Sequence, residues 1–284
     1  MSKNALHELY DTPWAITPGG FERVKDLVEN RIDDISAVQT HPGKSVQVGG
    51  NLKVRGNAGI IPIIGPIFRY AGIITWLLGF PSVDGIAQDV QTALDAPEVD
   101  SIILEIDSPG GQAAGIHELA GIIRSAQNQK PVYSYISGYG ASAAYWLASA
   151  ANEIVVNATA FTGSIGVVVG IRKPSGLEIV NTASPKKRPD PSSYEGRQQI
   201  LRLADDLAEI FIADVATFRG VSEETVKKDF GEGDVLIGHK AVAAGMVDRK
   251  GSFEALIQEL QDKKEGITMR ANTNQEPLSG LSEE

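Results

Sequence analysis

The sequence predicts an α/β protein built around a mostly parallel β-sheet. Three short apolar segments have the length and composition of buried strands: GIIPIIG from residue 59, SIILEID at 101–107 and PVYSYIS at 131–137. Helical periodicity follows the first segment at 83–94, where Ile86, Val90 and Leu94 share a face, and follows the second from Ile116. Strands that alternate with helices in this way form right-handed βαβ units, whose strands run parallel.

Residues 1–57 are predicted to form an N-terminal arm. They contain a short amphipathic stretch and Gly/Pro-containing linker sequence such as HPGKSVQVGG, and we expect them to contact other chains. The main α/β domain is expected at 58–262. The tail at 263–284 is polar and lacks periodicity, which is typical of a segment that is disordered or folds only on a partner. The apolar side chains of the amphipathic stretch are Phe21, Val24, Leu27 and Val28.

The second half of the domain continues the α/β pattern. A helix of small residues is expected at about 141–151, then a strand at EIVVNA, a turn at FTGS and a strand at IGVVVGI. A polar, proline-rich loop at 184–194 precedes a long amphipathic helix at about 195–219, and a helix-rich stretch ends near 260. The apolar side chains expected to face inward on the long helix are Ile200, Leu203, Leu207, Ile210, Phe211 and Val215.

Composition excludes several classes of function. The formal charge of −10 argues against nonspecific binding to nucleic acid or anionic membranes, both of which require basic surfaces. The absence of cysteine excludes disulfides, thiolate nucleophiles and cysteine-ligated zinc, and it allows a cytosolic compartment. The N-terminus lacks a signal-peptide pattern, and the most apolar window, Ile60–Phe80, is interrupted by proline and glycine, so neither secretion nor a membrane anchor is expected.

One serine lies where an activated hydroxyl is usually found. Ser142, in SGYGASAAYW, follows a predicted strand and falls in the first turn of a helix, where backbone amides favour a developing negative charge. On this segment alone, helix capping is the more ordinary role for a serine in this place. Upstream, the glycines of DSPGG let bare backbone amides approach a reacting carbonyl, although a simple strand-to-helix turn accounts for them too.

Histidine is a poor candidate for the general base. The four histidines, at 7, 41, 117 and 239, show no metal-ligand or catalytic spacing, and solvated or capping roles are favoured for each. A lysine can serve instead if its surroundings lower its pKa enough for a neutral amine. Lys186 and Lys187 lie in the proline-rich loop, where solvated charges are the ordinary alternative.

From Ile60 to Glu259 the chain resembles peptidase family S49, the group of signal peptide peptidase A and its phage relatives in capsid maturation. Five ordered motifs carry the resemblance: IIPIIGPI, SIILEIDSPGG, YGASAAYWLASAANEIVVNATAFTGSIGVV, ADVATFRGVSEETV and GDVLIGHKAVAAGMVD. The opening LYDTPWAITPGGFERV is similar to the start of phage head-maturation proteases.

The resemblance implies a role for each candidate residue. Ser142 matches the family nucleophile, and Ser164, in TGSIGV, matches the serine that hydrogen-bonds the catalytic lysine. Lys186 matches that lysine in the better register, with Pro191 as the proline that follows it, and Lys187 is the alternative. The oxyanion-hole region is matched by Gly110, Gly111 and the backbone of Ala143.

The family fold is crotonase-like or ClpP-like, with repeated ββα units, and it assembles into homo-oligomeric rings whose active sites can take residues from neighbouring subunits. The resemblance thus implies a Ser-Lys serine endopeptidase that needs no metal or organic cofactor. The substrate would be a polypeptide. A phage head-maturation role implies capsid, portal or scaffold proteins as partners, and the host cytoplasm or procapsid interior as location.

Three other functions remain open. The first is a signal-peptide-peptidase-like enzyme that degrades membrane-released peptides. The second is a catalytically silent capsid scaffold with the same fold, which the short lysine segment favours. The third is an acyl-CoA enzyme of the crotonase-like fold, which shares the GG oxyanion hole but typically uses an acidic base and a nucleotide pocket.

Overall fold

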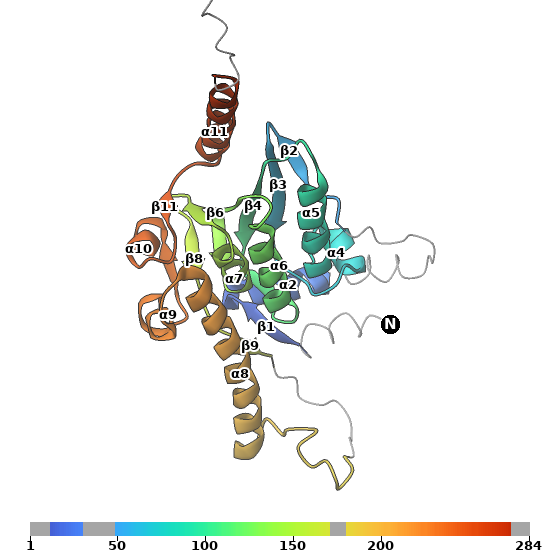
Figure 1. Ribbon diagram of the computed structural model, residues 1–284. Coiled ribbons are helices and arrows are strands. Elements are labelled where there is room, and N and C mark those ends of the chain that lie inside the picture. The colour runs from blue at the N-terminus through green and yellow to red at the C-terminus, as the bar shows by residue number, and fades with distance from the viewer. Residues whose placement is uncertain (1–11, 31–48, 171–179, 274–284) are drawn as a thin grey trace, which may run out of the picture.

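A computed structural model describes residues 12–30, 49–170 and 180–273. Figure 1 shows a central sheet with helices packed on it, and a long helix that extends away from it. The strands are β1 (Pro13–Ile16), β2 (Lys53–Arg55), β3 (Ala58–Ile64), β4 (Ser101–Ser108), β5 (Gly110–Gln112), β6 (Val132–Ala141), β7 (Glu153–Val156), β8 (Phe161–Gly163), β9 (Val168–Val169), β10 (Val235–Ile237) and β11 (Arg249–Lys250). The helices are α2 (Pro18–Asn30), α4 (Ile73–Leu78), α5 (Val83–Asp95), α6 (Ile116–Ala126), α7 (Ala143–Ser149), α8 (Tyr194–Arg219), α9 (Glu223–Asp229), α10 (Gly238–Ala243) and α11 (Phe253–Thr273).

The main sheet is mostly parallel, as the sequence predicts. Its strand order is β10-β8-β6-β4-β3-β2, and β7 and β11 continue it beside β6. Strands β3, β4, β6, β7 and β8 run parallel, while β2 and β10 pair antiparallel at the edges. Strand β6 is long enough to pair with β7 along its first half and with β8 along its last residues. The carboxyl ends of β4, β6 and β8 therefore lie together, and ligands of parallel α/β sheets usually bind at that edge.

The main core fills the space between the sheet and helices α5, α6 and α7. Strand side chains such as Ile102, Leu104 and Ile106 are fully buried, and so is every residue of α7. Burial of strands on both faces explains why SIILEID reads as a continuous apolar run rather than an alternating one. The opposite face of the sheet carries a smaller cluster, in which Tyr135 packs against Phe253 of α11.

A second, three-stranded sheet was not expected from the sequence. Its order is β5-β1-β9, so the strand formed by residues 13–16 lies between the GG segment and Val168–Val169 of the GVVVG run. Helix α2 follows at once, and Val24 and Val28 bury against Trp14 and Phe68. Part of the predicted N-terminal arm is thus packed onto the domain.

Three other local predictions differ from the structure. FTGS is not a plain turn, because Phe161–Gly163 form β8, and the predicted strand IGVVVGI is reduced to β9. On α8 only Phe211 and Val215 of the six predicted inward residues are buried, whereas Leu203 and Ile210 are 47% and 44% exposed. Helix α11 continues to Thr273, into the segment predicted as a disordered tail, and residues 274–284 lie outside the described residues.

The long helix α8 is anchored at one end only. The ring of Phe211 stacks on Trp146 at 4.4 Å, and Arg219 in the last turn pairs with Asp248 at 2.8 Å. The earlier turns run away from the sheet in Figure 1. Across the described ranges, no helix combines the length and apolar character needed to span a membrane.

Candidate active site

Ser142 has a backbone conformation that L-residues rarely adopt. It connects β6 to α7 with φ of 54° and ψ of −122°, and its amide donates to the carbonyl of Gly163 at 2.7 Å. A strained conformation of this kind costs roughly 1–3 kcal/mol and persists only where the surrounding structure imposes it, which is typical of functional sites. The side chain makes no capping hydrogen bond to α7. The capping interpretation of Ser142 is therefore not supported.

The two glycines of DSPGG lie beside Ser142. Gly110 has φ of 109°, and a methyl group placed on it would approach Ser142 Cβ to 3.0 Å. A methyl group on Gly111 would lie 2.1 Å from the carbonyl oxygen of Ile67. No side chain larger than hydrogen fits at either position. The glycines are thus required so that the backbone can approach the serine closely.

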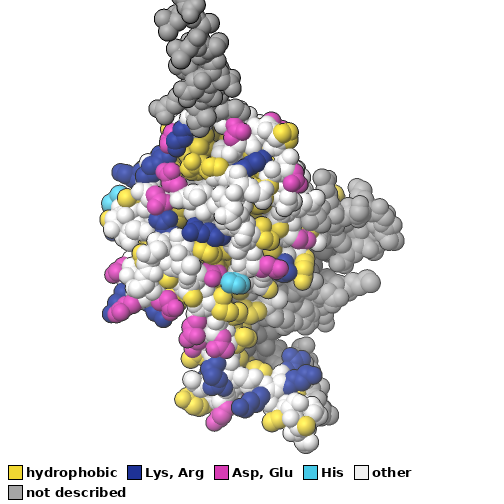
Figure 2. Space-filling model, in the orientation of Figure 1, with side chains coloured by type: hydrophobic (Ala, Val, Ile, Leu, Met, Phe, Trp, Pro, Cys, Tyr) yellow, Lys and Arg dark blue, Asp and Glu magenta, His cyan; other side chains and the backbone are white. Residues whose placement is uncertain are grey.

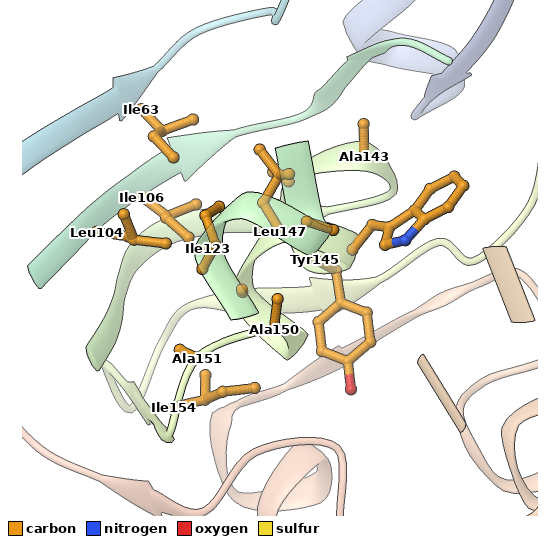
Figure 3. Close-up of a cluster of buried hydrophobic side chains, with 14 of the residues drawn as sticks. Ile63, Leu104, Ile106, Ile123, Ala143, Tyr145, Leu147, Ala150, Ala151 and Ile154 are labelled. Carbon is orange, nitrogen blue, oxygen red and sulfur yellow. The ribbon is translucent and has the colours of Figure 1, made fainter. Parts of the chain in front are cut away.

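Helix α7 fixes Ser142 and Ala143 on a rigid base. Figure 3 shows Ala143, Tyr145 and Leu147 of this helix among the apolar side chains of the strands and of α6. The hydroxyl of Tyr145 donates to the carbonyl of Met246 at 2.8 Å, and burial raises the pKa of Tyr145 above its ordinary value. Small residues allow the close packing of α7, since four of its seven residues are alanine or serine.

The segment of Ser164 runs alongside the serine. Ser164 has φ of 52°, its amide donates to the carbonyl of Asp234 at 2.8 Å, and it directly follows Gly163, the partner of the Ser142 amide. The Ser142 hydroxyl donates to the carbonyl of Gly166 at 3.4 Å. The structure therefore brings Ser142, Gly110, Gly111, Ala143 and the segment of Ser164 together.

A pocket of about 950 Å³ adjoins this group at the carboxyl edge of the sheet. Its lining includes Ser164, Asp107 and Pro109, together with residues of α2. The Asp107 carboxylate accepts the amide of Tyr139 at 2.8 Å, and the Tyr139 ring stacks on Phe161 at 5.2 Å. The pocket is large enough for several side chains of a polypeptide.

Lys186 and Lys187 are not beside Ser142 within the chain. Both are exposed, and the carbonyl of Lys186 accepts the side chain of Gln199, near the start of α8. Phe211, which marks the anchored part of α8, is twelve residues further along, or about 18 Å at 1.5 Å per residue. The loop lies at the lower end of Figure 1, where Figure 2 shows a group of basic side chains.

The described histidines take structural or exposed positions. His117 pairs with Asp214 at 2.6 Å, and the same carboxylate accepts the indole of Trp146 at 2.8 Å, while His239 is exposed. His7 and His41 lie outside the described residues. Among residues 12–30, 49–170 and 180–273, no cluster of three potential metal ligands occurs.

The contribution of β1 to the site was missed by sequence reasoning. Residues 13–16 pair with β5 and bring Ala15 and Ile16 against Gly110. The available signal was the short apolar run PWAI, followed by the turn-forming TPGG. Four residues are too few for a periodicity argument, and such a strand is defined by its partner.

Comparison with known proteins identifies one family. The model of peptidase family S49 matches residues 124–177 and 181–266. The head-tail preconnector protein GP5 of Enterobacteria phage P21 is 31% identical over 200 residues, covering 66% of this chain and 40% of that protein. The capsid assembly protease C of Escherichia phage lambda is 30% identical over 221 residues, covering 74% and 50%. Protease 4 of Haemophilus influenzae is 30% identical over 203 residues, covering 63% and 32%. The chain thus spans half or less of each of these relatives.

Proposed function

Because the chain belongs to peptidase family S49, we propose that it is a serine endopeptidase with Ser142 as nucleophile and Lys186 as general base. The observation that carries the proposal is the strained Ser142 backbone, held against Gly110 at the carboxyl edge of the sheet. This combination places backbone amides close to a fixed hydroxyl, where they can stabilise an oxyanion. A ClpP-like arrangement of the units is part of the same proposal.

The proposed reaction has two halves. Neutral Lys186 removes the proton of the Ser142 hydroxyl, and the oxygen attacks a peptide carbonyl. The amides of Gly110, Gly111 and Ala143 stabilise the resulting oxyanion, and the protonated lysine delivers its proton to the leaving amine. Water then hydrolyses the ester on Ser142. Apart from this water, each step uses side chains and backbone amides of the protein.

Within one chain Lys186 does not lie beside Ser142, so the lysine that acts on Ser142 must come from another position. Lys186 lies on a loop beyond the outer turns of α8, whose side chains Leu201, Leu203 and Ile210 are exposed. A second copy of the chain that packs on this apolar stretch would bring its own loop, and Lys186, toward Ser142 of its neighbour. Ser164 would then orient the amine. This arrangement makes the homo-oligomer the catalytic unit.

Mutant mixing tests the nucleophile and the base together. The assay is cleavage of a dye-labelled, chemically unfolded casein by wild type, Ser142→Ala, Lys186→Ala and a mixture of the two variants. We expect both variants to be inactive alone, whereas a mixture that exchanges subunits recovers about a quarter of wild-type activity, because a quarter of the sites combine an intact serine with an intact lysine. No recovery would place both residues in the same copy, and activity of Ser142→Ala would exclude it as nucleophile.

The phage relatives favour a role in head maturation. Two of the similar proteins are named as a capsid assembly protease and a head-tail preconnector protein. We therefore propose capsid, portal or scaffold polypeptides as substrates, in the host cytoplasm or procapsid interior. Degradation of membrane-released peptides is the second candidate, because relatives named Protease 4 also match. Co-expression with phage head proteins distinguishes the two, since the first predicts defined processing products.

The silent-scaffold alternative requires a separate test. A fluorophosphonate probe forms a covalent adduct only with an activated serine. Labelling of wild type but not of Ser142→Ala, measured by intact mass, supports the peptidase, whereas absence of labelling in an assembled oligomer supports the scaffold.

A further inference from the structure

Strand β1 fills a gap between two strands of the candidate active site. It pairs antiparallel with Gly110–Gln112 on one side and with Val168–Val169 on the other. An extended peptide that binds by strand addition occupies this kind of position, because its backbone amides and carbonyls pair with exposed strand edges. The chain's own residues 13–16 thus lie where a polypeptide substrate would pair with the GG segment.

The register of β1 directs one carbonyl toward the predicted oxyanion hole. Hydrogen bonds join Ala113 N to Pro13 O at 3.0 Å and Thr17 N to Pro109 O at 2.9 Å. Hydrogen-bonded pairs alternate along an antiparallel ladder, so the bonded pair between these two is Ala15 with Gly111. The carbonyl of Ala15 therefore faces the amide of Gly111.

The same carbonyl is close to the nucleophile. A methyl group placed on Gly110 would lie 2.2 Å from Ala15 O, 2.9 Å from Ile16 Cα and 3.0 Å from Ser142 Cβ. The Ala15–Ile16 peptide bond therefore lies next to Gly110, and so does the side chain of Ser142. Ser142 is only 1% exposed, so a second polypeptide cannot reach its hydroxyl while β1 stays in place.

We propose that the Ala15–Ile16 peptide bond is the protein's own first substrate, cleaved by Ser142 of the same chain; this rests on the proposed function. The Ser142 oxygen forms an ester with the carbonyl carbon of Ala15 as the C–N bond breaks. The serine proton passes through the general base to the amine of Ile16. Water then hydrolyses the ester, which releases residues 1–15 and restores the hydroxyl.

Packing explains both the choice of residue and the result of cleavage. The methyl of Ala15 is buried in the main core cluster, which includes Ile67 and Ala143, so no larger side chain fits there. Ile16 belongs to the second cluster, defined around Trp14, and remains attached to α2, where Val24 and Val28 hold it. Residues 13–15 lose their covalent link to α2 when the bond is cut, and only the pairing with β5 and β9 and the buried ring of Trp14 then hold them. Their dissociation would open the strand position for other polypeptides.

The primary experiment follows the N-terminus of the protein. Full-length wild type and Ser142→Ala are purified at equal concentration, incubated, and analysed by intact mass and N-terminal sequencing. We expect wild type to yield a chain that begins at Ile16 and a fragment that ends at Ala15, and Ser142→Ala to stay full-length. When an excess of wild type is mixed with tagged Ser142→Ala, the tagged chain should stay full-length, because each β1 lies against its own Ser142. Cleavage of the tagged chain at Ala15–Ile16 would overturn the proposal.

Two alanine-to-leucine substitutions test whether added bulk blocks self-cleavage only when it is placed at residue 15. Ala15→Leu places a larger side chain in the filled site and is expected to abolish cleavage after residue 15, and cleavage of unfolded casein, followed on the same samples, should fall because β1 then stays against Ser142. Ala158→Leu, at an exposed position between β7 and β8, should change neither activity. Unaltered self-cleavage in Ala15→Leu would contradict the assigned register.

Casein cleavage distinguishes a failure of the proposed self-cleavage from a failure of the proposed peptidase activity. Wild type that cleaves casein through Ser142 but keeps residues 1–15 contradicts self-cleavage and leaves the peptidase intact. Wild type that cleaves neither, although it is oligomeric, overturns both.

Discussion

The two halves of the candidate dyad are built in opposite ways. Ser142 is 1% exposed and held between the GG segment, the Gly163 carbonyl and the fully buried helix α7. Lys186 is exposed on a polar loop, and its carbonyl accepts the side chain of Gln199 on the outer part of α8. Packing within the chain fixes the position of Ser142, whereas the side chain of Lys186 points into solvent.

This difference indicates which part of the chemistry a single chain can prepare alone. A strained nucleophile and close backbone amides need a rigid core, since their geometry must hold within fractions of an ångström. A general base also needs desolvation and precise placement, and the exposed lysine loop has neither. Assembly of several copies would supply both and would keep single chains inactive.

Replacement of Lys186 is expected to have the largest effect on activity. Lys186→Ala is expected to lower peptidase activity at least about a thousandfold, as loss of a general base that acts with a serine does. The thermal midpoint should stay within about 2 °C of wild type, because exposed loop side chains contribute little to folding. Casein cleavage and scanning calorimetry on the same samples measure both.

Lys187→Ala is the matched control for this prediction, because its side chain is exposed on the same loop. It should retain most of the activity. A reversed result, with Lys187→Ala inactive and Lys186→Ala active, would shift the base by one residue. Large destabilisation by either substitution would contradict the description of the loop as weakly packed.

Gly110→Ala tests the surroundings of Ser142. Its methyl would lie 2.2 Å from Ala15 O at a φ of 109°, so both backbone strain and displacement of β1 are expected. We expect activity to fall about a hundredfold, the usual effect of disturbing one oxyanion donor. The free energy of unfolding should fall by roughly 1–3 kcal/mol. Denaturant titration and casein cleavage measure the two effects.

Gly121→Ala provides the control, because nothing lies within 4 Å of its added methyl group in α6. It should leave activity unchanged and stabilise the protein by about 0.5–1 kcal/mol, since alanine is the better helix former. Equal losses in the two variants would mean that Gly110 has no special relation to the serine.

The parts of the fold that could be predicted from sequence are those with strong local patterns. The strands at 101–107 and 131–137 and the helix at 83–94 are confirmed, because long buried apolar runs admit few other structures. Among the site residues, the surroundings of Ser142 followed from a strand, a glycine turn and a helix of small residues. The motifs of the resemblance then located the glycines.

What could not be predicted depends on distant partners. Strand β1 has only four residues, and its pairing with β5 joins positions about a hundred residues apart. Leu203 and Ile210 fit the helical pattern of α8, yet the described residues leave them 47% and 44% exposed. Periodicity shows that a face is apolar, but not which surface will meet it.

A pair of substitutions in α8 tests whether its two ends differ as described. Phe211→Ala removes a fully buried ring stacked on Trp146 and should lower the free energy of unfolding by about 3–5 kcal/mol. Leu203→Ala, at a side chain 47% exposed, should cost less than about 0.5 kcal/mol in the monomer. Urea unfolding under dilute conditions gives both values. A large cost at Leu203 without any oligomer would show that the outer turns are packed within the chain.

The smallest expected effect concerns the pH dependence of the lysine loop. Asp190 accepts hydrogen bonds from the Ser192 hydroxyl at 2.6 Å and the Ser192 amide at 2.9 Å, and these bonds lower the pKa of Asp190 below its ordinary value. A carboxyl group whose pKa is lower in the folded state stabilises that state above its unfolded pKa, and the contribution is lost as the pH falls through the folded value. The loop turn should therefore be intact at neutral pH and loosen only in acid. A carbon-13 carboxyl titration measures the pKa, and Ser192→Ala should raise it toward the ordinary value while leaving the midpoint of unfolding at pH 7 almost unchanged, because the group is exposed. An unaltered pKa of Asp190 in Ser192→Ala would mean that the loop lacks this turn in solution. The position of Lys186 would then be even less constrained relative to Ser142.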